Sequence, residues 1–218
     1  MSVQKNYKVQ QISGYFMGRK KRSDRTKPDH WTIKAKSEGF EARSVYKLEE
    51  MNKRFQIFER PKRVLDLGCA PGSWSQLIRK RFPKSTIVGI DIKMLNKYSG
   101  IFLHGSILDT PTEIFLEHLG GQADLVISDM APNTTGTRLT DHVRQIELAK
   151  MALETALRTL RMGGNFVVKV FDGEDAYDFV QSIRPHFEKT RRVKPKVTRN
   201  ESVEFFVIGL HRKEVDTK

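Results

Sequence analysis

Short runs of aliphatic and β-branched residues alternate with amphipathic segments along most of the chain after residue 62. Apolar runs bounded by turn residues predict buried strands, whereas apolar positions three and four apart predict helices. The predicted strands cover residues 63–67, 85–91, 101–104, 123–128, 165–171, 192–197 and 202–211. The predicted helices cover residues 31–58, 73–82, 112–119, 141–162 and 175–187. We expect the fourth helix to end at Gly163 and Gly164, because glycine is common just past a helix C-terminus.

This alternation of strands and helices predicts parallel βαβ units, and therefore an α/β fold with helices on both faces of a mostly parallel seven-stranded sheet. We expect one domain over residues 31–212, after an N-terminal arm of residues 1–30 and before a short tail of residues 213–218. Ligands of such sheets bind beyond the carboxyl ends of the strands, at the topological switch point. The candidate site therefore lies where strands end.

The first predicted strand ends in a glycine turn that begins the next helix. Gly68 and Gly72 allow the backbone to approach a ligand closely, although both glycines could simply form a tight turn. The segment has neither the third glycine of a dinucleotide fingerprint nor the lysine of a P-loop. Asp66 would repel a pyrophosphate and suits a ligand with a positive end, such as the amino group and sulfonium of S-adenosylmethionine. Asp91, at the end of the second strand, could bind a ribose diol.

Three further charged residues occupy informative positions. Asp129 follows the strand 123–128 and precedes a proline-containing loop, where it could also be a helix N-cap or an Asx-turn residue. Lys169 lies in the apolar run 166–171, and a buried lysine is rare unless it is paired. It is therefore either exposed on an edge strand or directed at carboxylates in a site, where a lysine can act as a general base. Glu204 is similarly anomalous in the run 202–207. By contrast, Lys47 taken alone is typical of a solvated helix face.

The charge of the chain is large and uneven. The 218 residues contain 39 Lys and Arg against 26 Asp and Glu, a net charge of +13. Residues 1–63 carry 17 basic and 7 acidic side chains, so the remainder is nearly neutral. This excess excludes an acidic solvating protein and predicts a polyanionic partner, with nucleic acid favoured. The residues expected to contact phosphates are Arg19, Lys20, Lys21, Arg22, Lys34, Lys36 and Arg43.

Other classes of protein are disfavoured by what the sequence contains. Cys69 is the only cysteine, so an intrachain disulfide is impossible, and the six histidines lack the spacing of metal ligands. We therefore expect no metal. No apolar run reaches the roughly 18 residues of a membrane helix, so we expect no membrane partner. A cytoplasmic monomer is expected, with a nuclear, nucleolar or mitochondrial location open in a eukaryote.

Five segments together resemble the FtsJ/RrmJ family of RNA 2′-O-ribose methyltransferases. They are residues 43–48, 66–76, 128–133 followed by Gly136, 166–171 with Gly173 and Glu174, and 202–207, so the resemblance spans roughly residues 30–210. It implies a Rossmann-like methyltransferase sheet that uses S-adenosylmethionine. The Lys-Asp-Lys-Glu catalytic tetrad of the family falls on Lys47, Asp129, Lys169 and Glu204. Its cofactor contacts fall on Gly72, Trp74, Asp91 and Asp129.

The sequence departs from the family at one cofactor position. The family usually has an acid after the glycine that ends the third strand, where it contacts the adenine amino group. Here Ser106 follows Gly105, and Asp109 comes three residues later. Either Ser106 or Asp109 could replace the usual contact.

The resemblance implies methylation of a ribose 2′-hydroxyl with Lys169 as general base. The main expectation is a uridine of large-subunit ribosomal RNA, free or in a pre-ribosomal particle. A tRNA anticodon-loop methyltransferase is the alternative, because the tetrad is shared. A non-catalytic RNA-binding ribosome-assembly factor is an alternative of another class, although it would be expected to lose a tetrad residue. A small-molecule methyltransferase would explain the glycine turn but not the basic arm, and an mRNA-cap enzyme usually has additional elements.

Overall fold

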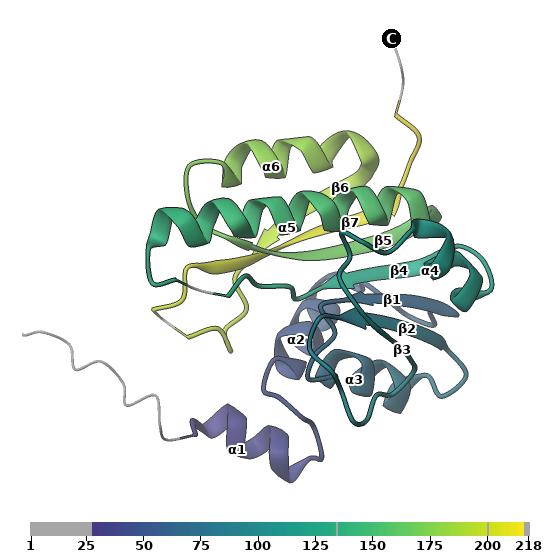
Figure 1. Cartoon of the computed structure of the whole chain (residues 1–218), viewed down its shortest axis with the longest axis horizontal. Coiled ribbons are helices and arrows are strands. Elements are labelled where there is room, and N and C mark those ends of the chain that lie inside the picture. The colour runs from purple at the N-terminus through teal and green to yellow at the C-terminus, as the bar shows by residue number, and fades with distance from the viewer. Residues whose placement is uncertain (1–27, 134, 200, 216–218) are drawn as a thin grey trace, which may run out of the picture.

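A single seven-stranded sheet organises the described part of the chain. The computed structural model describes residues 28–133, 135–199 and 201–215. Within these residues the strands lie in the order β3-β2-β1-β4-β5-β7-β6, and β7 alone runs antiparallel to its neighbours (Figure 1). The strands are β1 (Arg63–Leu67), β2 (Thr86–Asp91), β3 (Ile101–His104), β4 (Ala123–Ser128), β5 (Leu160–Phe171), β6 (Phe187–Val193) and β7 (Glu204–Arg212). The expected α/β fold with a mostly parallel seven-stranded sheet is confirmed.

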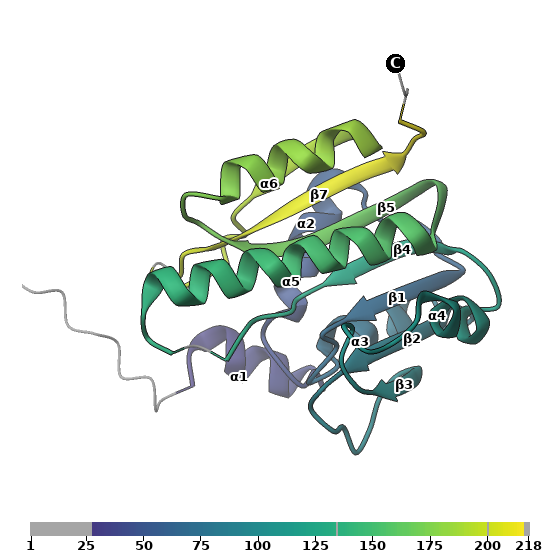
Figure 2. The same cartoon turned by 45° about the horizontal axis from the view of Figure 1, so that its top comes forward.

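Helices cover both faces of this sheet (Figures 1 and 2). One face is covered by α2 (Val45–Phe55) and α3 (Ser73–Arg81), with α1 (His30–Ser37) beside α2. The other is covered by α4 (Thr112–Leu119), α5 (Arg138–Thr159) and α6 (Ala176–Ile183), the last continued by the 3-10 helix η1 (Arg184–His186). Among the described residues, no helix combines the length and the apolar character needed to span a bilayer.

Each face of the sheet has its own apolar core because side chains alternate along a strand. In β5, Phe166, Val168 and Val170 pack under α5 and α6, whereas Val167 packs towards α2 and α3. Lys169 has the same parity as Val167, so its side chain lies on the α2 side of a strand that has neighbours on both edges. The alternative that Lys169 lies on an exposed edge strand is therefore wrong.

The expected helix over residues 31–58 is two helices. Glu38 caps α1, Gly39 follows with a φ of 81°, and the amide of Phe40 donates to the carbonyl of Ala35 at 2.8 Å. This arrangement is typical of a helix that ends in a left-handed glycine. The amphipathic spacing continues on both sides of the break, and Gly39 was the available signal that the helix ends.

Two further predicted boundaries differ from the structure. The helix α5 ends at Thr159 rather than at the glycines, because Leu160 already pairs with Ala123 of β4. Gly163 and Gly164 lie in β5, where the register with β4 shifts. The strand β6 covers 187–193 instead of 192–197, since an edge strand tolerates charged outward side chains that hide its pattern.

Candidate active site

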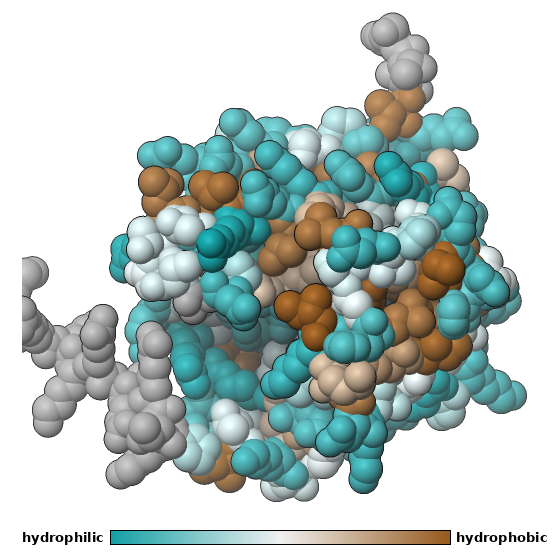
Figure 3. Space-filling model, viewed as in Figure 1, coloured by the Kyte–Doolittle hydropathy of each residue, from teal (hydrophilic) through white to brown (hydrophobic). Residues whose placement is uncertain are grey.

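The carboxyl ends of β1 and β4 lie side by side, and the strand order reverses between them. Both strands point towards the same side of the molecule (Figure 2). On that side, hydrophilic side chains surround a hollow between α1 and the N-terminal end of α5 (Figure 3). The switch point predicted from the alternation of elements is therefore where the candidate site residues gather.

Gly68 and Gly72 shape the turn between β1 and α3. Their φ angles are 72° and 102°, values that residues other than glycine rarely adopt. A Cβ on Gly68 would lie 2.4 Å from Cγ of Met130, so the turn packs directly against the segment after β4. A Cβ on Gly72 would meet only Cδ2 of Tyr98, at 3.7 Å, so this position is open.

Asp66 supports this turn from inside the protein. It is only 1% exposed, and its Oδ2 accepts a hydrogen bond from the Ser75 hydroxyl at 2.5 Å and one from the Tyr98 hydroxyl at 3.4 Å. Burial raises the pKa of Asp66 to about 7; the hydrogen bond from Ser75 opposes the shift, and the Asp129 carboxylate adds to it. Asp66 therefore does not present its carboxylate to a ligand as expected, because the chain directs it towards α3.

Asp91 joins the end of β2 to the glycine turn. Its Oδ2 accepts from the amide of Ala70 at 2.8 Å, and its Oδ1 accepts from the amide of Lys93 at 2.8 Å. The residue is partly exposed, and each carboxylate oxygen keeps a further lone pair. Asp91 thus both fixes the turn and remains able to accept hydrogen bonds from a ribose diol.

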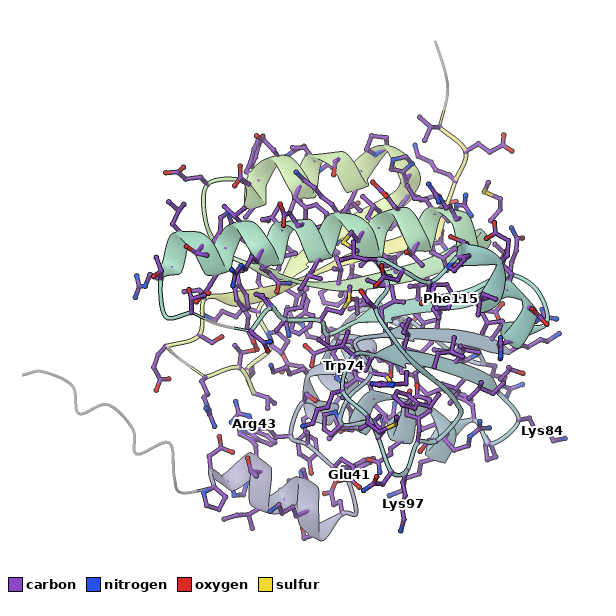
Figure 4. The ribbon with its side chains drawn as sticks, in the orientation of Figure 1. Glu41, Arg43, Trp74, Lys84, Lys97 and Phe115 are labelled. Carbon is purple, nitrogen blue, oxygen red and sulfur yellow. The ribbon has the colours of Figure 1, made fainter. Side chains whose placement is uncertain are left out.

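Trp74 has a structural role that its position in the glycine motif does not reveal. Its Nε1–H donates to the carbonyl of Ser44 at 2.8 Å, and its ring lies 5.8 Å from that of Phe206. Figure 4 shows the side chain inside the body of the domain. The indole therefore attaches the start of α2 to the core and is not open to a cofactor. The first-turn amides of α3 have no helical acceptor and remain the groups that could contact one.

Ser106 lies beside Asp91, whereas Asp109 does not. The amide of Gly105 donates to the carbonyl of Asp91 at 3.0 Å, which brings the Ser106 loop to the end of β2. The Ser106 hydroxyl accepts from the amide of Leu108 at 3.1 Å and keeps its own proton for donation. Asp109 is exposed and lines a separate cavity of about 470 Å³ against α5. The geometry therefore favours Ser106 as the residue near an adenine.

These groups fit the chemistry of S-adenosylmethionine. The N-terminus of α3 suits a carboxylate, because its free amides and the helix dipole favour an anion. Asp91 suits a ribose diol, and Asp129 suits a cationic amino group or sulfonium. Gly72 leaves the entrance to this turn without a side chain. Among the described residues there is no group of three or more side chains that could hold a metal ion.

Lys169 and Asp129 form one buried ion pair. Ser128 is in register with Val168 of the neighbouring parallel strand, so Asp129 follows β4 directly beside Lys169. Lys169 Nζ donates to Oδ1 of Asp129 at 3.0 Å and to its carbonyl at 2.5 Å. Lys169 is 6% exposed. Two acceptors on one residue hold the amine in a fixed position, as expected for a lysine directed at a site.

Lys47 and Glu204 form a second ion pair on the same face of the sheet. Glu204 begins β7 two residues before Phe206, and Phe206 is the cross-strand partner of Lys169. Glu204 and Lys169 are therefore diagonal neighbours, within reach of long side chains. Lys47 Nζ contacts Oε1 of Glu204 and lies 5.7 Å from the centre of the Phe206 ring. The four residues of the expected tetrad thus come together as two adjacent pairs.

Lys47 shows where local sequence reasoning fails. As an isolated position it is typical of a solvated helix face, yet it is only 8% exposed. Its partner Glu204 is 157 residues away, so no local pattern could indicate the contact. Ser75 and Tyr98, which bind Asp66, were also missed, because neutral polar residues near a turn give no distinctive signal.

The predicted phosphate contacts have different outcomes. Arg19, Lys20, Lys21 and Arg22 lie outside the described residues. Lys36 is exposed on α1, and Lys34 lies over the ring of Tyr46 at 4.9 Å. Both remain candidates.

Arg43 differs from this expectation because protein groups already bind its guanidinium. Nη1 pairs with Asp29, and Nη2 donates to the carbonyl of Val197 at 2.7 Å. Figure 4 shows Arg43 between α1 and the body of the domain. Its position is that of a structural clamp. A second basic run, which the prediction missed although it is readable in the sequence, contains Arg191, Arg192, Lys194, Lys196 and Arg199.

Comparison with known proteins relates the chain to methyltransferases. The profile of the FtsJ-like methyltransferase family matches residues 40–212. The ribosomal RNA large subunit methyltransferase E of Methanothrix thermoacetophila is 43% identical over 85% of this chain and 73% of its own. The protein of the same name from Desulfatibacillum aliphaticivorans is 40% identical over 90% of this chain and 97% of its own. A crystal structure of a Plasmodium falciparum protein, described as a ribosomal RNA methyltransferase, shares the fold with a TM-score of 0.68 at 24% identity, covering 79% of this chain and 98% of that one.

Proposed function

The chain belongs to the FtsJ-like methyltransferase family, and on this premise we propose that it methylates a ribose 2′-hydroxyl in RNA with S-adenosylmethionine. One observation carries the proposal: Lys169–Asp129 and Lys47–Glu204 form adjacent ion pairs at the carboxyl ends of β4 and β5. A single buried pair is common as a structural element. Two pairs beside a glycine turn that suits S-adenosylmethionine are better explained by chemistry on a substrate.

Lys169 acts as the general base in this proposal. When bound, S-adenosylmethionine supplies the methyl group to the ribose oxygen. Nζ of Lys169, in its neutral form, accepts the proton that the 2′-hydroxyl loses as the oxygen–methyl bond forms. Asp129 holds that amine through its carboxylate and its carbonyl. A base in a fixed position typically contributes about 10²–10⁴-fold to the rate.

Lys47 and Glu204 position the ribose beside Lys169. Each neutralises the other, so the pair can orient hydroxyl groups through hydrogen bonds without adding net charge to the site. Alignment of the hydroxyl with the methyl donor can contribute more than the base itself. All four tetrad residues have a partner in place, which favours a catalyst over a non-catalytic RNA-binding factor.

Two observations favour RNA as the substrate: the net positive charge of the chain and the names of its relatives. A net charge of +13 favours binding to a phosphate backbone, which attracts cations irrespective of sequence. The curated relatives described above are named as methyltransferases of large-subunit ribosomal RNA. We therefore propose large-subunit ribosomal RNA as the substrate, and the choice of a uridine within it rests on the family resemblance alone.

Transfer of labelled methyl groups from S-adenosylmethionine by the full-length protein tests the proposal. Large-subunit ribosomal RNA, intact large subunits and total tRNA serve as acceptors, and alkali-stable dinucleotides report 2′-O-methylation. Lys169→Ala should lower turnover by about 10²-fold or more while cofactor binding by calorimetry persists. Lys189→Ala, which removes an exposed lysine of β6, is the matched control and should retain full turnover. Near wild-type turnover of Lys169→Ala would contradict the assignment of the base, and label in tRNA alone would contradict the proposed RNA class.

A further inference from the structure

A second cavity opens beside the tetrad, on the side away from the glycine turn. Its volume is about 520 Å³, within the usual range for small-molecule sites. It is lined by Asp172, Arg192, Lys194, Glu201, Ser202, Val203, Glu204 and Phe205. Glu204 belongs to both the cavity and the tetrad. The connection between β6 and β7 that borders it lies on the same side of the molecule as α1 and the start of α5 (Figure 1).

Arg192 forms a fixed flat wall of this cavity. Its guanidinium lies 3.9 Å from the centre of the Phe205 ring, and Nη2 donates to Oδ1 of Asp172 at 2.7 Å. Phe205 is buried on the α5 and α6 face of the sheet, opposite to the face that carries Glu204, so the cavity extends around the start of β7 from the tetrad to the guanidinium. The Arg192 side chain is still 50% exposed, and a guanidinium backed by a ring on one side has its other face available. Such a plane is a stacking surface for a nucleobase.

The charges of the cavity disfavour a phosphate. The carboxyl residues Asp172, Glu201 and Glu204 line it together with two cations. Asp172 neutralises Arg192, and Lys194 Nζ already donates to the carbonyl of Ser202 at 2.7 Å. Both cations of the cavity therefore already have acceptors within the protein, which disfavours a phosphate as the ligand. A neutral ring with hydrogen-bonding edges meets a flat cation, a hydroxyl and carboxylate acceptors, which are the groups that read base edges in single-stranded RNA.

The rim of the cavity is attached to α2. The amide of Lys196 donates to Oε2 of Glu50 at 2.8 Å, and the carbonyl of Val197 accepts from Arg43 at 2.7 Å. These contacts attach Lys196 and Val197, which follow Lys194 of the cavity lining, to the side of α2 that carries Lys47. The cavity and the tetrad therefore keep a constant relative position, as a substrate spanning both would require.

We propose that this cavity binds a nucleobase of the RNA strand next to the methylated nucleotide, stacked on the guanidinium of Arg192. The inference rests on the proposed function, because RNA is taken as the substrate. It deepens that function by giving the strand a base-binding subsite beside the ribose-binding one. Contact through the base would also make the protein favour single-stranded over helical RNA, since only unpaired bases can enter the cavity.

Binding of two RNA decamers to the full-length protein separates base contacts from backbone contacts. One decamer carries uracil at every position, and the other has the same ribose-phosphate backbone without bases. The dissociation constant of the base-free decamer divided by that of the uracil decamer measures the contribution of the bases to binding. Arg192→Ala should reduce this ratio roughly 5- to 150-fold, the range that corresponds to the loss of one stacked base. Arg192→Lys keeps the charge without the plane and should reduce it similarly.

Arg191→Ala is the matched control. Arg191 is the exposed neighbour of Arg192 and does not line the cavity; its Nη1 donates to the carbonyl of Thr190 at 3.0 Å. This variant should leave the ratio unchanged. The proposal is wrong if Arg192→Ala leaves the ratio unchanged, if Arg192→Lys restores it, or if Arg191→Ala lowers it equally. Methylation of ribosomal RNA by the wild-type protein is measured in parallel and tests the proposed function alone. Failure of the proposed function can therefore be distinguished from failure of the base-binding proposal.

Discussion

Asp66 is a carboxyl group enclosed under the glycine turn, next to two other acids at the strand ends. Its hydrogen bonds to Ser75 and Tyr98 satisfy the group without removing the effect of burial. The pKa of Asp66 is consequently raised to about 7 from its usual 3.8. The folded protein therefore binds this proton more tightly than the unfolded chain does.

Asp66→Asn should therefore alter how stability depends on pH. As the pH rises from about 4 to 7, the unfolded chain loses the Asp66 proton first, so the wild-type protein loses stability over this window and no further above it. The asparagine keeps an acceptor for Ser75 and cannot ionise. Its free energy of unfolding should rise relative to that of the wild type by up to roughly 4 kcal/mol between pH 4 and 7. Urea denaturation at pH 4.5, 6 and 8 measures the difference, and a difference that is constant or falls with pH would contradict this account.

At the residue scale, buried lysines differ in how readily a sequence reveals them. Lys169 is flanked by apolar residues on a predicted central strand, so its charge is conspicuous. Lys47 lies among charged residues on a helix, and its contacts with Glu204 and Phe206 of β7 are not visible in the local pattern. The family resemblance identifies Lys47 because it carries information on tertiary contacts that the local pattern lacks. Asp66 and Trp74 are the opposite case. Both lie in the motif expected to contact the cofactor, but their side chains are buried in the protein and support the site instead of facing it.

Among the elements, the chain from Arg43 into α2 positions the loop that precedes β7. Arg43, Lys47 and Glu50 are spaced four and three residues apart, so they share one side of the chain entering α2. Each contacts the other wall of the site: Arg43 the carbonyl of Val197, Lys47 the carboxylate of Glu204, and Glu50 the amide of Lys196. Lys196, Val197 and Glu204 are thus attached to α2, which carries a tetrad lysine, and to the residues just before it.

Arg43→Ala should loosen this attachment. Loss of the bonds to Asp29 and Val197 should lower the free energy of unfolding by about 1–3 kcal/mol, since hydrogen bonds from a charged group are among the stronger ones. Amide hydrogen exchange in residues 194–199 should become faster, and turnover should fall more than cofactor affinity. Lys53→Ala removes an exposed positive charge from α2, the helix that follows Arg43, and should change none of these. Unchanged exchange in Arg43→Ala would show that the arginine is not a clamp and would return it to the phosphate-binding candidates.

Elements with a clear apolar period were predicted closely, and those governed by tertiary pairing were not. The strands β1, β3 and β4 and the helix α4 have the predicted bounds, because each is apolar with turn residues at both ends. The start of β5 depends on pairing with Ala123, and β6 is a charged edge strand held by β7. Neither condition is visible in a local window.

For the whole molecule, the basic residues fall into two groups: those that would bind RNA phosphates and those that belong to the candidate active site. Two of the lysines counted in the net charge belong to the tetrad, and Arg43 is paired inside the protein. The arm before α1 has seven basic residues and one acidic residue over positions 1–25, and these positions lie outside the described residues. The arm remains the main candidate for sequence-independent contacts with phosphates.

Deletion of residues 1–25 should weaken RNA binding and flatten its dependence on salt. For each phosphate of single-stranded RNA that the arm neutralises, its deletion should reduce the slope of log affinity against log salt by about 0.7. Fluorescence anisotropy with a uridine decamer at several salt concentrations gives this slope. Deletion of residues 213–218, which carry no net charge, is the control and should leave it unchanged. If the protein without the arm has the same slope as the full-length protein, the phosphate contacts lie elsewhere. The run from Arg191 to Arg199 is then the next candidate.

Mapping of 2′-O-methylribose across the RNA of cells that lack this protein tests the central claim most directly. We predict that one methylated uridine of large-subunit ribosomal RNA is lost, that the wild-type gene restores it, and that Lys169→Ala does not. A complete set of ribose methylations in the deficient cells, or full restoration by Lys169→Ala, would contradict the account.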